Sequence, residues 1–428
     1  MQRNTKQKPP SSQPAQSAVS PSCRLNELGL YGVVSLLSAG AFLQSMLLVY
    51  EGAALLFGGV ILAVCVTLYS LTLPVPPAVA VKRLVMIGAV VVVFAIFVVN
   101  GMRGGGGFRP VNIGYGTYFA DITPFVFICL GASFVNLNER QLIRLLKCMV
   151  AMSLITVVPM IGSVDAGAVA QMGARELAVG DDMRFGYVVV MTHALFLTFA
   201  GYALLCFVDD WKWRIVAMAC FASAAGAALL YSKRATLATM IIACPWFLYK
   251  HIRRHGMAGL VVLLALAIPT AAIAAVVLSG DGTASRLADM LEERIYSANS
   301  LADVDRLYEV GQMFAASSWR ELLIGSGLCS YQNYAGWFWN TTIHVGWANI
   351  IFKGGFVLLL LLIVLATSAT IGGLRKTGVR RELCALAAVI MSIEWLHSTG
   401  WGVSISGLLL SMISMGFLLS GNGSYQRK

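Results

Sequence analysis

The sequence predicts an all-α polytopic membrane protein with about twelve transmembrane helices and a large, partly helical loop on the outer side. Of its 428 residues, 58% are hydrophobic and only 12% are charged, about half the charged share of a soluble globular protein. The apolar residues also form successive blocks of about 20 residues, the length that spans a bilayer. The mean hydropathy of +0.77 agrees with this pattern. These observations exclude a water-soluble enzyme.

The apolar blocks predict the order of elements along the chain. Residues 1–27, rich in Gln, Pro and Ser, predict a disordered cytoplasmic tail because they cannot bury enough apolar surface to fold. Nine helices are expected within 28–279 and three within 344–420, separated by a loop over 280–343 and followed by a short cytoplasmic tail over 421–428. The expected spans are 28–50, 52–72, 84–100, 117–135, 142–162, 185–206, 214–232, 234–250, 257–279, 344–370, 383–398 and 401–420.

The Lys and Arg residues of the short loops predict the orientation, because such residues concentrate on the cytoplasmic side. With the N-terminus inside, fourteen of them fall in inner loops and adjoining span ends and six in short outer loops. Both termini are therefore expected in the cytoplasm and the loop over 280–343 outside. The net charge of +11 is then explained by topology and anionic lipid headgroups rather than by nucleic acid. The inner residues are Lys82, Arg83, Arg140, Arg144, Lys147, Lys212, Arg214, Lys250, Arg253, Arg254, Arg375, Lys376, Arg380 and Arg381, and the outer ones are Arg103, Arg109, Arg175, Arg184, Lys233 and Arg234.

Four polar features lie on the expected outer side, where an apolar protein has room for chemistry. The first is an arginine at the mouth of the sixth span, and the second is a pair of cations at the turn between the seventh and eighth spans. The third is an amphipathic helix in the long loop, and the fourth is a Gly-x-Gly segment followed by a histidine and a glycine-rich helix start. The residues concerned are Arg184; Lys233 and Arg234; the stretch 303–309, which opens a helix running to about Trp319; and Gly325, Ser326, Gly327, His344, Asn349, Lys353, Gly354 and Gly355.

This ordered set, over residues 180–370, resembles the O-antigen ligase and Wzy-type polymerase superfamily. The resemblance implies a cofactor-free, metal-independent glycosyltransferase of the bacterial inner membrane. Such an enzyme moves an oligosaccharide from an undecaprenyl pyrophosphate carrier to an acceptor sugar on the periplasmic side. It also implies that Arg184, Arg234 and Arg306 hold the donor pyrophosphate and that His344 activates the acceptor hydroxyl. Val345 and Lys233 depart from the common family pattern.

The chemistry of these residue types supports the same reaction. A pyrophosphate leaving group gains negative charge as the glycosidic bond breaks, and arginine stabilises it through bidentate contacts. A sugar hydroxyl needs a general base, and histidine, with an ordinary pKa of about 6.5, accepts a proton near neutral pH. A base acting opposite the leaving group gives inversion at the anomeric carbon, whereas retention would require a carboxylate nucleophile such as Glu309.

Each candidate also has a simpler interpretation. Arg184 and Arg234 are also typical of helix anchors at headgroup phosphates, and Lys233 of a cation that reaches up to the interface. His344 could serve as an interfacial helix cap. Glu394 and His397 form an expected polar pair in or beside the eleventh span, and we rank both as secondary candidates with Lys233, Glu309 and Asn349.

Asp303 and Asp305 match the metal-binding Asp-x-Asp of nucleotide-sugar transferases. We favour a helix N-terminus, where aspartate stabilises free backbone amides and the helix dipole. We therefore expect no metal site at these residues.

The function expected from the sequence is polymerisation of lipid-linked oligosaccharide repeat units into an O-antigen or exopolysaccharide. The nearest alternative is a ligase that transfers the glycan to lipid A core or to protein. A transporter or flippase for the same lipid-linked sugar and a structural subunit of a secretion complex are more distant. The expected partners are the lipid-linked oligosaccharide, membrane lipids, a chain-length regulator and a flippase, and no nucleic acid.

Overall fold

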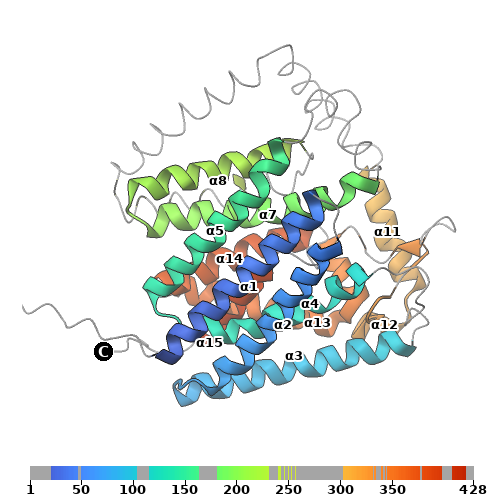
Figure 1. Ribbon diagram of the computed structural model, residues 1–428. Helices are drawn as coiled ribbons and strands as arrows, with labels where there is room; N and C mark the ends of the chain where they lie inside the picture. Colours follow the sequence, from blue (N-terminus) through green and yellow to red (C-terminus); the bar gives the residue numbers. More distant parts are fainter. Residues whose placement is uncertain are drawn as a thin grey trace, which may run out of the picture.

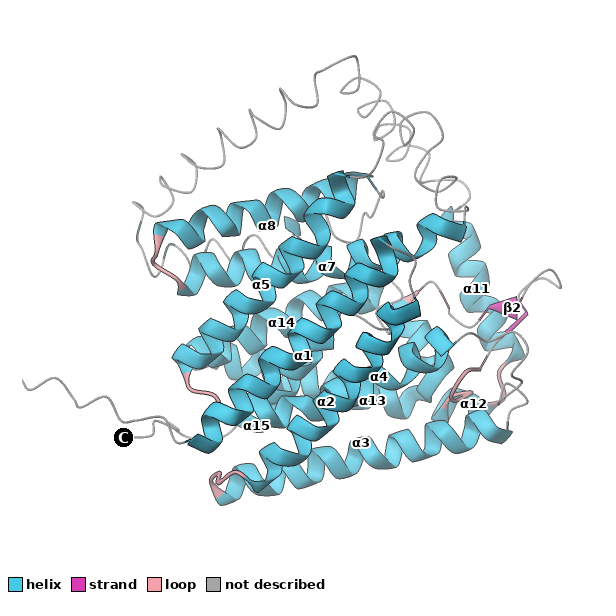
Figure 2. Ribbon diagram, in the orientation of Figure 1, coloured by secondary structure: helices cyan, strands magenta, loops and turns pink. Residues whose placement is uncertain are grey.

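In the residues that it describes, the computed structural model is a helical bundle with one small two-stranded hairpin (Figures 1 and 2). It describes residues 21–46, 50–103, 115–162, 181–230, 302–330, 332–333, 339–340, 343, 345–375, 378–397 and 407–420, with single positions between 240 and 256. The helices are α1 (Pro21–Met46), α2 (Tyr50–Thr72), α3 (Pro77–Arg103), α4 (Tyr115–Phe134), α5 (Glu139–Gly162), α7 (Asp181–Phe207), α8 (Trp211–Leu230), α11 (Ala302–Ala316), α12 (Trp319–Ile324), α13 (Gly346–Arg375), α14 (Val379–His397) and α15 (Gly407–Leu419). Strand β1 (Gln332–Asn333) pairs antiparallel with β2 (Trp339–Asn340).

Local sequence signals explain where several helices begin. Pro77 is the first residue of α3, a position that suits proline because its missing N–H would have no helical partner. Asn138 precedes α5, and its side chain accepts the N–H of Gln141 while the Gln141 side chain accepts the N–H of Asn138. Ser318 and Glu321 form the same reciprocal cap before α12.

Five described helices are long and apolar enough to cross a membrane: α1, α2, α3, α5 and α13. Their outward faces are apolar as well, since Leu68, Leu84 and Leu360 are each at least 60% exposed. A water-soluble protein rarely leaves so much apolar surface uncovered. The chain is therefore a helical membrane protein, as the sequence predicts.

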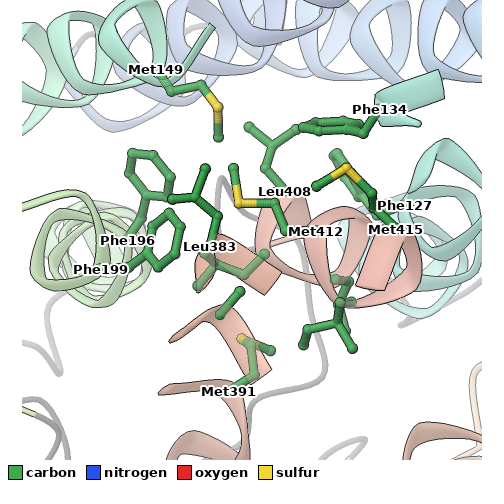
Figure 3. Packing of buried hydrophobic residues seen from close by; sticks show 14 of the residues in the cluster. Phe127, Phe134, Met149, Phe196, Phe199, Leu383, Met391, Leu408, Met412 and Met415 are labelled. Carbon is green, nitrogen blue, oxygen red and sulfur yellow. The ribbon is translucent and has the colours of Figure 1, made fainter. Parts of the chain in front are cut away.

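The centre of the bundle is α15, a helix that is buried on nearly all sides and packs against α4, α13 and α14. Such all-round burial is typical of a central helix. Side chains from α4, α5, α7, α14 and α15 interlock around it (Figure 3). Figure 3 labels Phe127, Phe134, Met149, Phe196, Phe199, Leu383, Met391, Leu408, Met412 and Met415.

Small residues let these helices approach closely. A Cβ on Gly131 of α4 would lie 2.5 Å from the Cβ of Ser414 in α15, and one on Gly416 would lie 2.6 Å from the Cβ of Ala369 in α13. Apolar burial drives helices together weakly in lipid, so close packing of small residues is a main source of affinity between membrane helices.

Most predicted spans coincide with a described helix, with end points shifted by up to seven residues. Helix α1 begins at Pro21, so residues 21–27, which are predicted to belong to the disordered tail, are helical. The predicted spans 234–250 and 257–279 lie outside the described residues apart from single positions, so the total of twelve remains a prediction. The predicted loop over 280–343 contains α11, α12 and the β1–β2 hairpin in its described part.

One predicted span is wrong in that it is not a single continuous helix. The sequence predicts a single helix over 344–370, but α13 contains a break at Gly355, whose φ and ψ are 69° and −175°. The segment after the break, 356–375, is about 30 Å long and suffices to cross a bilayer alone. The nine residues Gly346–Gly354 therefore form a separate short helical segment before the span.

The bundle has two chemically different ends. At the first end, which we call the basic end (left in Figure 2), lie the α2–α3, α4–α5, α7–α8 and α13–α14 connections. Helix α12 and the C-terminal end of α3 lie at the second, which we call the α12 end (right in Figure 1). The break in α13 lies at the same end, because Ser326 and Gly327, which follow α12, donate hydrogen bonds to the carbonyl oxygens of Phe352 and Lys353. Basic residues near the connections of the first end are Lys82, Arg83, Arg140, Arg144, Lys147, Lys212, Arg214, Arg375, Arg380 and Arg381.

Candidate functional site at the break in α13

The Gly325–Gly327 segment packs directly on the break in α13. In the last turn before a helix break, the backbone carbonyl oxygens have no helical N–H donor in the following turn and need other donors. The Ser326 N–H donates to the carbonyl oxygen of Phe352 at 2.8 Å, and the Gly327 N–H donates to that of Lys353 at 3.0 Å. Irregular backbone inside a membrane protein is tolerated where protein groups satisfy it in this way. The two glycine motifs that the sequence analysis singled out are thus brought into contact.

Glycine is required at this contact for two reasons. Gly325 and Gly327 have φ values of +81° and +93°, which side chains rarely adopt. A Cβ on Gly325 would lie 2.2 Å from the carbonyl oxygen of Lys353, and one on Gly327 would lie 2.1 Å from the backbone nitrogen of Gly101 in α3. Gly325 therefore leaves no room for a side chain against α13, and Gly327 leaves none against α3.

Asn100 ties the same segment to the end of α3. Its Nδ2 donates to the carbonyl oxygens of Ile324 and Gly325, each at 3.2 Å. The Leu328 N–H adds a 3.0 Å hydrogen bond to the carbonyl oxygen of Phe97. Because the Asn100 side chain is buried, these contacts replace water that would otherwise solvate the two carbonyls.

A buried ion pair lies beside the break. The Lys353 Nζ is 3.0 Å from the Oδ2 of Asp121 in α4, and the two side chains are 2% and 5% exposed. The same Oδ2 accepts the Cys329 N–H at 2.9 Å, and the Lys353 ammonium also donates to the carbonyl oxygen of Ser330 at 3.4 Å. Two opposite charges are thus held together with additional hydrogen bonds, as a buried pair requires.

Asn349 anchors the chain that leads into α13. It lies one helical turn before Lys353, is buried, and accepts the Ile343 N–H at its Oδ1 at 3.1 Å. Ile343 directly precedes His344. Within the described part of the chain the Asn349 Nδ2 makes no hydrogen bond, and neither does the buried Ser330 Oγ. Asn349 thus fixes the backbone next to the predicted base.

Only some of the predicted donor-binding and catalytic residues lie in the described part of the chain. His344, Arg234 and Lys233 lie outside the described residues. Arg184 is the fourth residue of α7, whose N-terminal end lies away from the α7–α8 connection and hence toward the α12 end. Arg306 is the fifth residue of α11, which also lies at the α12 end (Figure 1). The side chains of these two arginines lie outside the described part.

The secondary candidates fall on two helices. Glu309 is partly buried on α11. Glu394 is partly buried near the C-terminal end of α14, and His397 is the last residue of that helix, with its side chain outside the described part. Since α11 begins at Ala302, Asp303 and Asp305 fall in its first turn, as the helix-terminus interpretation predicts.

Sequence reasoning missed Asn100 and Asp121. Each is a polar residue in or at the end of a predicted apolar span, at 84–100 and 117–135. A carboxylate within an apolar span is a functional or structural candidate by default, and this rule would have identified Asp121 from the sequence.

No protein-family model matches the chain, and no curated protein matches its sequence.

Proposed function

We propose that the protein is a membrane glycosyltransferase that polymerises undecaprenyl-pyrophosphate-linked oligosaccharide units into a surface polysaccharide. One structural observation supports this function most strongly. The Gly-Ser-Gly segment and the helix that follows His344 pack on each other at one end of an apolar bundle. Arg184 and Arg306 lie on helices that reach the same end. These features occur along the chain in the order typical of the O-antigen ligase and Wzy-type polymerase superfamily.

In the proposed orientation, the α12 end faces the periplasmic side of the bacterial inner membrane. Basic residues cluster near the opposite connections, and lysine and arginine concentrate in cytoplasmic loops. Both termini are then cytoplasmic. A carrier-linked donor in the outer leaflet has its pyrophosphate at headgroup depth, and in this orientation α11 and the N-terminal end of α7 lie on the periplasmic side.

In the proposed reaction, arginine guanidinium groups hold the donor pyrophosphate. Arg184, Arg234 and Arg306 would supply planar forks that contact phosphate oxygens in pairs and stabilise the charge of the leaving group. Lys233, next to Arg234, would add a point charge. The leaving group is undecaprenyl pyrophosphate, so the reaction requires no nucleotide.

His344 would act as the general base for the acceptor hydroxyl. It takes the hydroxyl proton as the oxygen attacks the anomeric carbon, and the glycosidic bond to the pyrophosphate breaks. The hydrogen bond from Ile343 to Asn349 supports this role, because it fixes the backbone beside the histidine. A base has to be held within reach of the proton that it removes.

A transport function has one observation in its favour. The Asp121–Lys353 pair is an ionisable pair buried within the helix bundle, and such pairs also occur in proton-coupled carriers. The pair lies beside Gly325–Gly327, which we call the glycine segment, at one end of the bundle and not midway along the bundle. This position favours the transferase.

The direct test incubates purified protein in detergent with carrier-linked repeat units. A ladder of longer carrier-linked glycans supports the polymerase. Transfer only to added lipid A core supports the ligase alternative. The ladder should persist in EDTA, because we expect no metal in the reaction. Vesicles that contain the protein should not move the lipid-linked sugar between leaflets; movement without transfer would establish the transporter.

His344→Ala should abolish the ladder at an unchanged protein level. His251→Ala is a matched control, because the sequence places His251 at the cytoplasmic end of the eighth predicted span. Wild-type activity in His344→Ala would remove the proposed base.

A further inference from the structure

The Asp121–Lys353 pair joins three segments that are far apart in the sequence. Asp121 belongs to α4, Lys353 to the short helical segment before the break in α13, and Cys329 and Ser330 to the chain that follows the glycine segment. The Oδ2 of Asp121 accepts from both Lys353 and Cys329, at 3.0 and 2.9 Å. All three segments therefore meet at one carboxylate.

The stability of the bundle does not explain such a pair. The two charges lose almost all contact with water, because their side chains are only 2% and 5% exposed. Their attraction then roughly offsets the cost of desolvation, and a well-packed apolar pair of similar volume is often as stable. What the ion pair adds is directionality, because it is satisfied in one relative placement of α4 and α13.

We propose that Asp121 and Lys353 form a positioning pair that orients the segment Gly346–Gly354 against α4. This inference rests on the proposed function, because the oriented segment carries His344 before its first turn. The segment is nine residues long and ends at a break. Two of its side chains bind residues outside the segment: Lys353, close to the break, binds Asp121, and Asn349, the fourth residue, accepts the N–H of Ile343. In this role neither Asp121 nor Lys353 contacts substrate.

Positioning and chemistry make different predictions for paired substitutions. Asp121→Asn and Lys353→Met each leave one buried charge without its partner, which is strongly destabilising for the local arrangement. The double variant removes both charges and keeps an acceptor at residue 121 for the Cys329 N–H. A positioning pair therefore predicts that the double variant is less impaired than either single variant. A chemical role for Lys353 predicts that the double variant is as inactive as Lys353→Met.

Cys329 provides a readout that does not depend on activity. Its side chain is fully buried and its N–H binds Asp121. Purified full-length protein in detergent is treated with N-ethylmaleimide, and the modification of Cys329 is followed by mass spectrometry. Cys329 should be modified about tenfold faster in each single variant than in the wild type. A buried charge without its partner weakens the contact between α4, Gly346–Gly354 and the chain at Cys329, so that Cys329 is exposed more often. The double variant should react at close to the wild-type rate.

Glu27→Gln and Arg144→Met are matched controls, since these residues form an ion pair at the basic end, 3.2 Å apart. They should leave the modification rate of Cys329 unchanged. Wild-type rates in both Asp121→Asn and Lys353→Met would overturn the positioning role. The modification rates test the positioning role even if the wild-type protein shows no glycosyl transfer. Absence of transfer by the wild-type protein would reject the proposed function and leave the positioning role standing.

In the transfer assay, the single variants should lower kcat about tenfold or more while the KM for the donor changes little, because the arginines that would bind the donor are untouched. The double variant should regain most of the lost kcat. A double variant that protects Cys329 yet stays as inactive as Lys353→Met would overturn the proposal and give Lys353 a chemical role.

Discussion

The backbone N–H of Gly327 donates a 3.0 Å hydrogen bond to the carbonyl oxygen of Lys353. Lys353 in turn binds Asp121 through its ammonium group. One residue of α13 thus contacts the glycine segment through its backbone and α4 through its side chain. The geometry of the break therefore depends on both contacts.

The two glycines of the segment should not tolerate a methyl group. Gly325→Ala and Gly327→Ala force a side chain to adopt a positive φ and to overlap backbone atoms at 2.2 and 2.1 Å. Strain of this kind costs about 1–3 kcal/mol before the overlap is counted. Each variant should lower the unfolding midpoint in detergent clearly. The control is Gly88→Ala in α3, where a Cβ meets nothing within 4 Å, and it should be neutral or stabilising.

Asn100 should be needed as a donor. Asn100→Asp keeps the shape but turns an oxygen toward the carbonyl oxygens of Ile324 and Gly325, which need hydrogen-bond donors. The loss of these bonds should cost about 1–3 kcal/mol of stability, because the groups are buried. The same substitution at Asn138 is the control. That side chain accepts the N–H of Gln141 at a helix start, and aspartate accepts equally well. Equal unfolding midpoints for the two variants would contradict the assignment.

The ion pair at the basic end should depend mainly on its buried partner. Glu27 accepts hydrogen bonds from Tyr31 and Gln141, each at 2.8 Å, and its side chain is 5% exposed, whereas that of Arg144 is 59% exposed. Glu27→Ala should cost about 1–3 kcal/mol because it leaves buried donors unpaired. Arg144→Met should cost less than about 1 kcal/mol, because Arg144 is exposed to solvent and Glu27 keeps its hydrogen bonds from Tyr31 and Gln141. Thermal unfolding of both variants measures the difference, and a larger loss for Arg144→Met would be inconsistent with this view.

Arg306 should matter as a fork and not only as a charge. Arg306→Ala should lower kcat/KM for the carrier-linked donor about 10- to 100-fold, the usual worth of hydrogen bonds to a charged group. Arg306→Lys should recover little of this loss, because an ammonium group cannot make paired contacts with phosphate oxygens. Arg320→Ala in α12 is the control, since Arg320 is exposed and has no proposed role. Full recovery in Arg306→Lys would indicate a helix anchor instead.

The helices were largely predictable because span length and apolar content are local properties of the chain. The predicted spans 52–72 and 142–162 lie close to α2 and α5, and the helix expected to begin near Asp303 begins at Ala302. The two glycine motifs were also visible as motifs. Their contact was not predictable, since nothing local connects Ser326 with Phe352.

The ion pair was harder to predict for the same reason. Asp121 binds partners 208 and 232 residues further along the chain, and pairing over such distances depends on the tertiary arrangement of α4 and α13. The break at Gly355 was equally hidden, because glycine is frequent in unbroken membrane helices. Its presence becomes clear only once the segment that satisfies the carbonyls of Phe352 and Lys353 is seen.

The most direct test of the central claim is the glycan profile of a strain that lacks this gene, with lipid-A-linked, carrier-linked and secreted glycans separated by length. A polymerase predicts single repeat units in place of polymer, restored to full length by the wild-type gene and not by His344→Ala. Full-length chains that remain on the lipid carrier would instead establish the ligase alternative. A profile unchanged from the parent strain would contradict glycosyl transfer altogether.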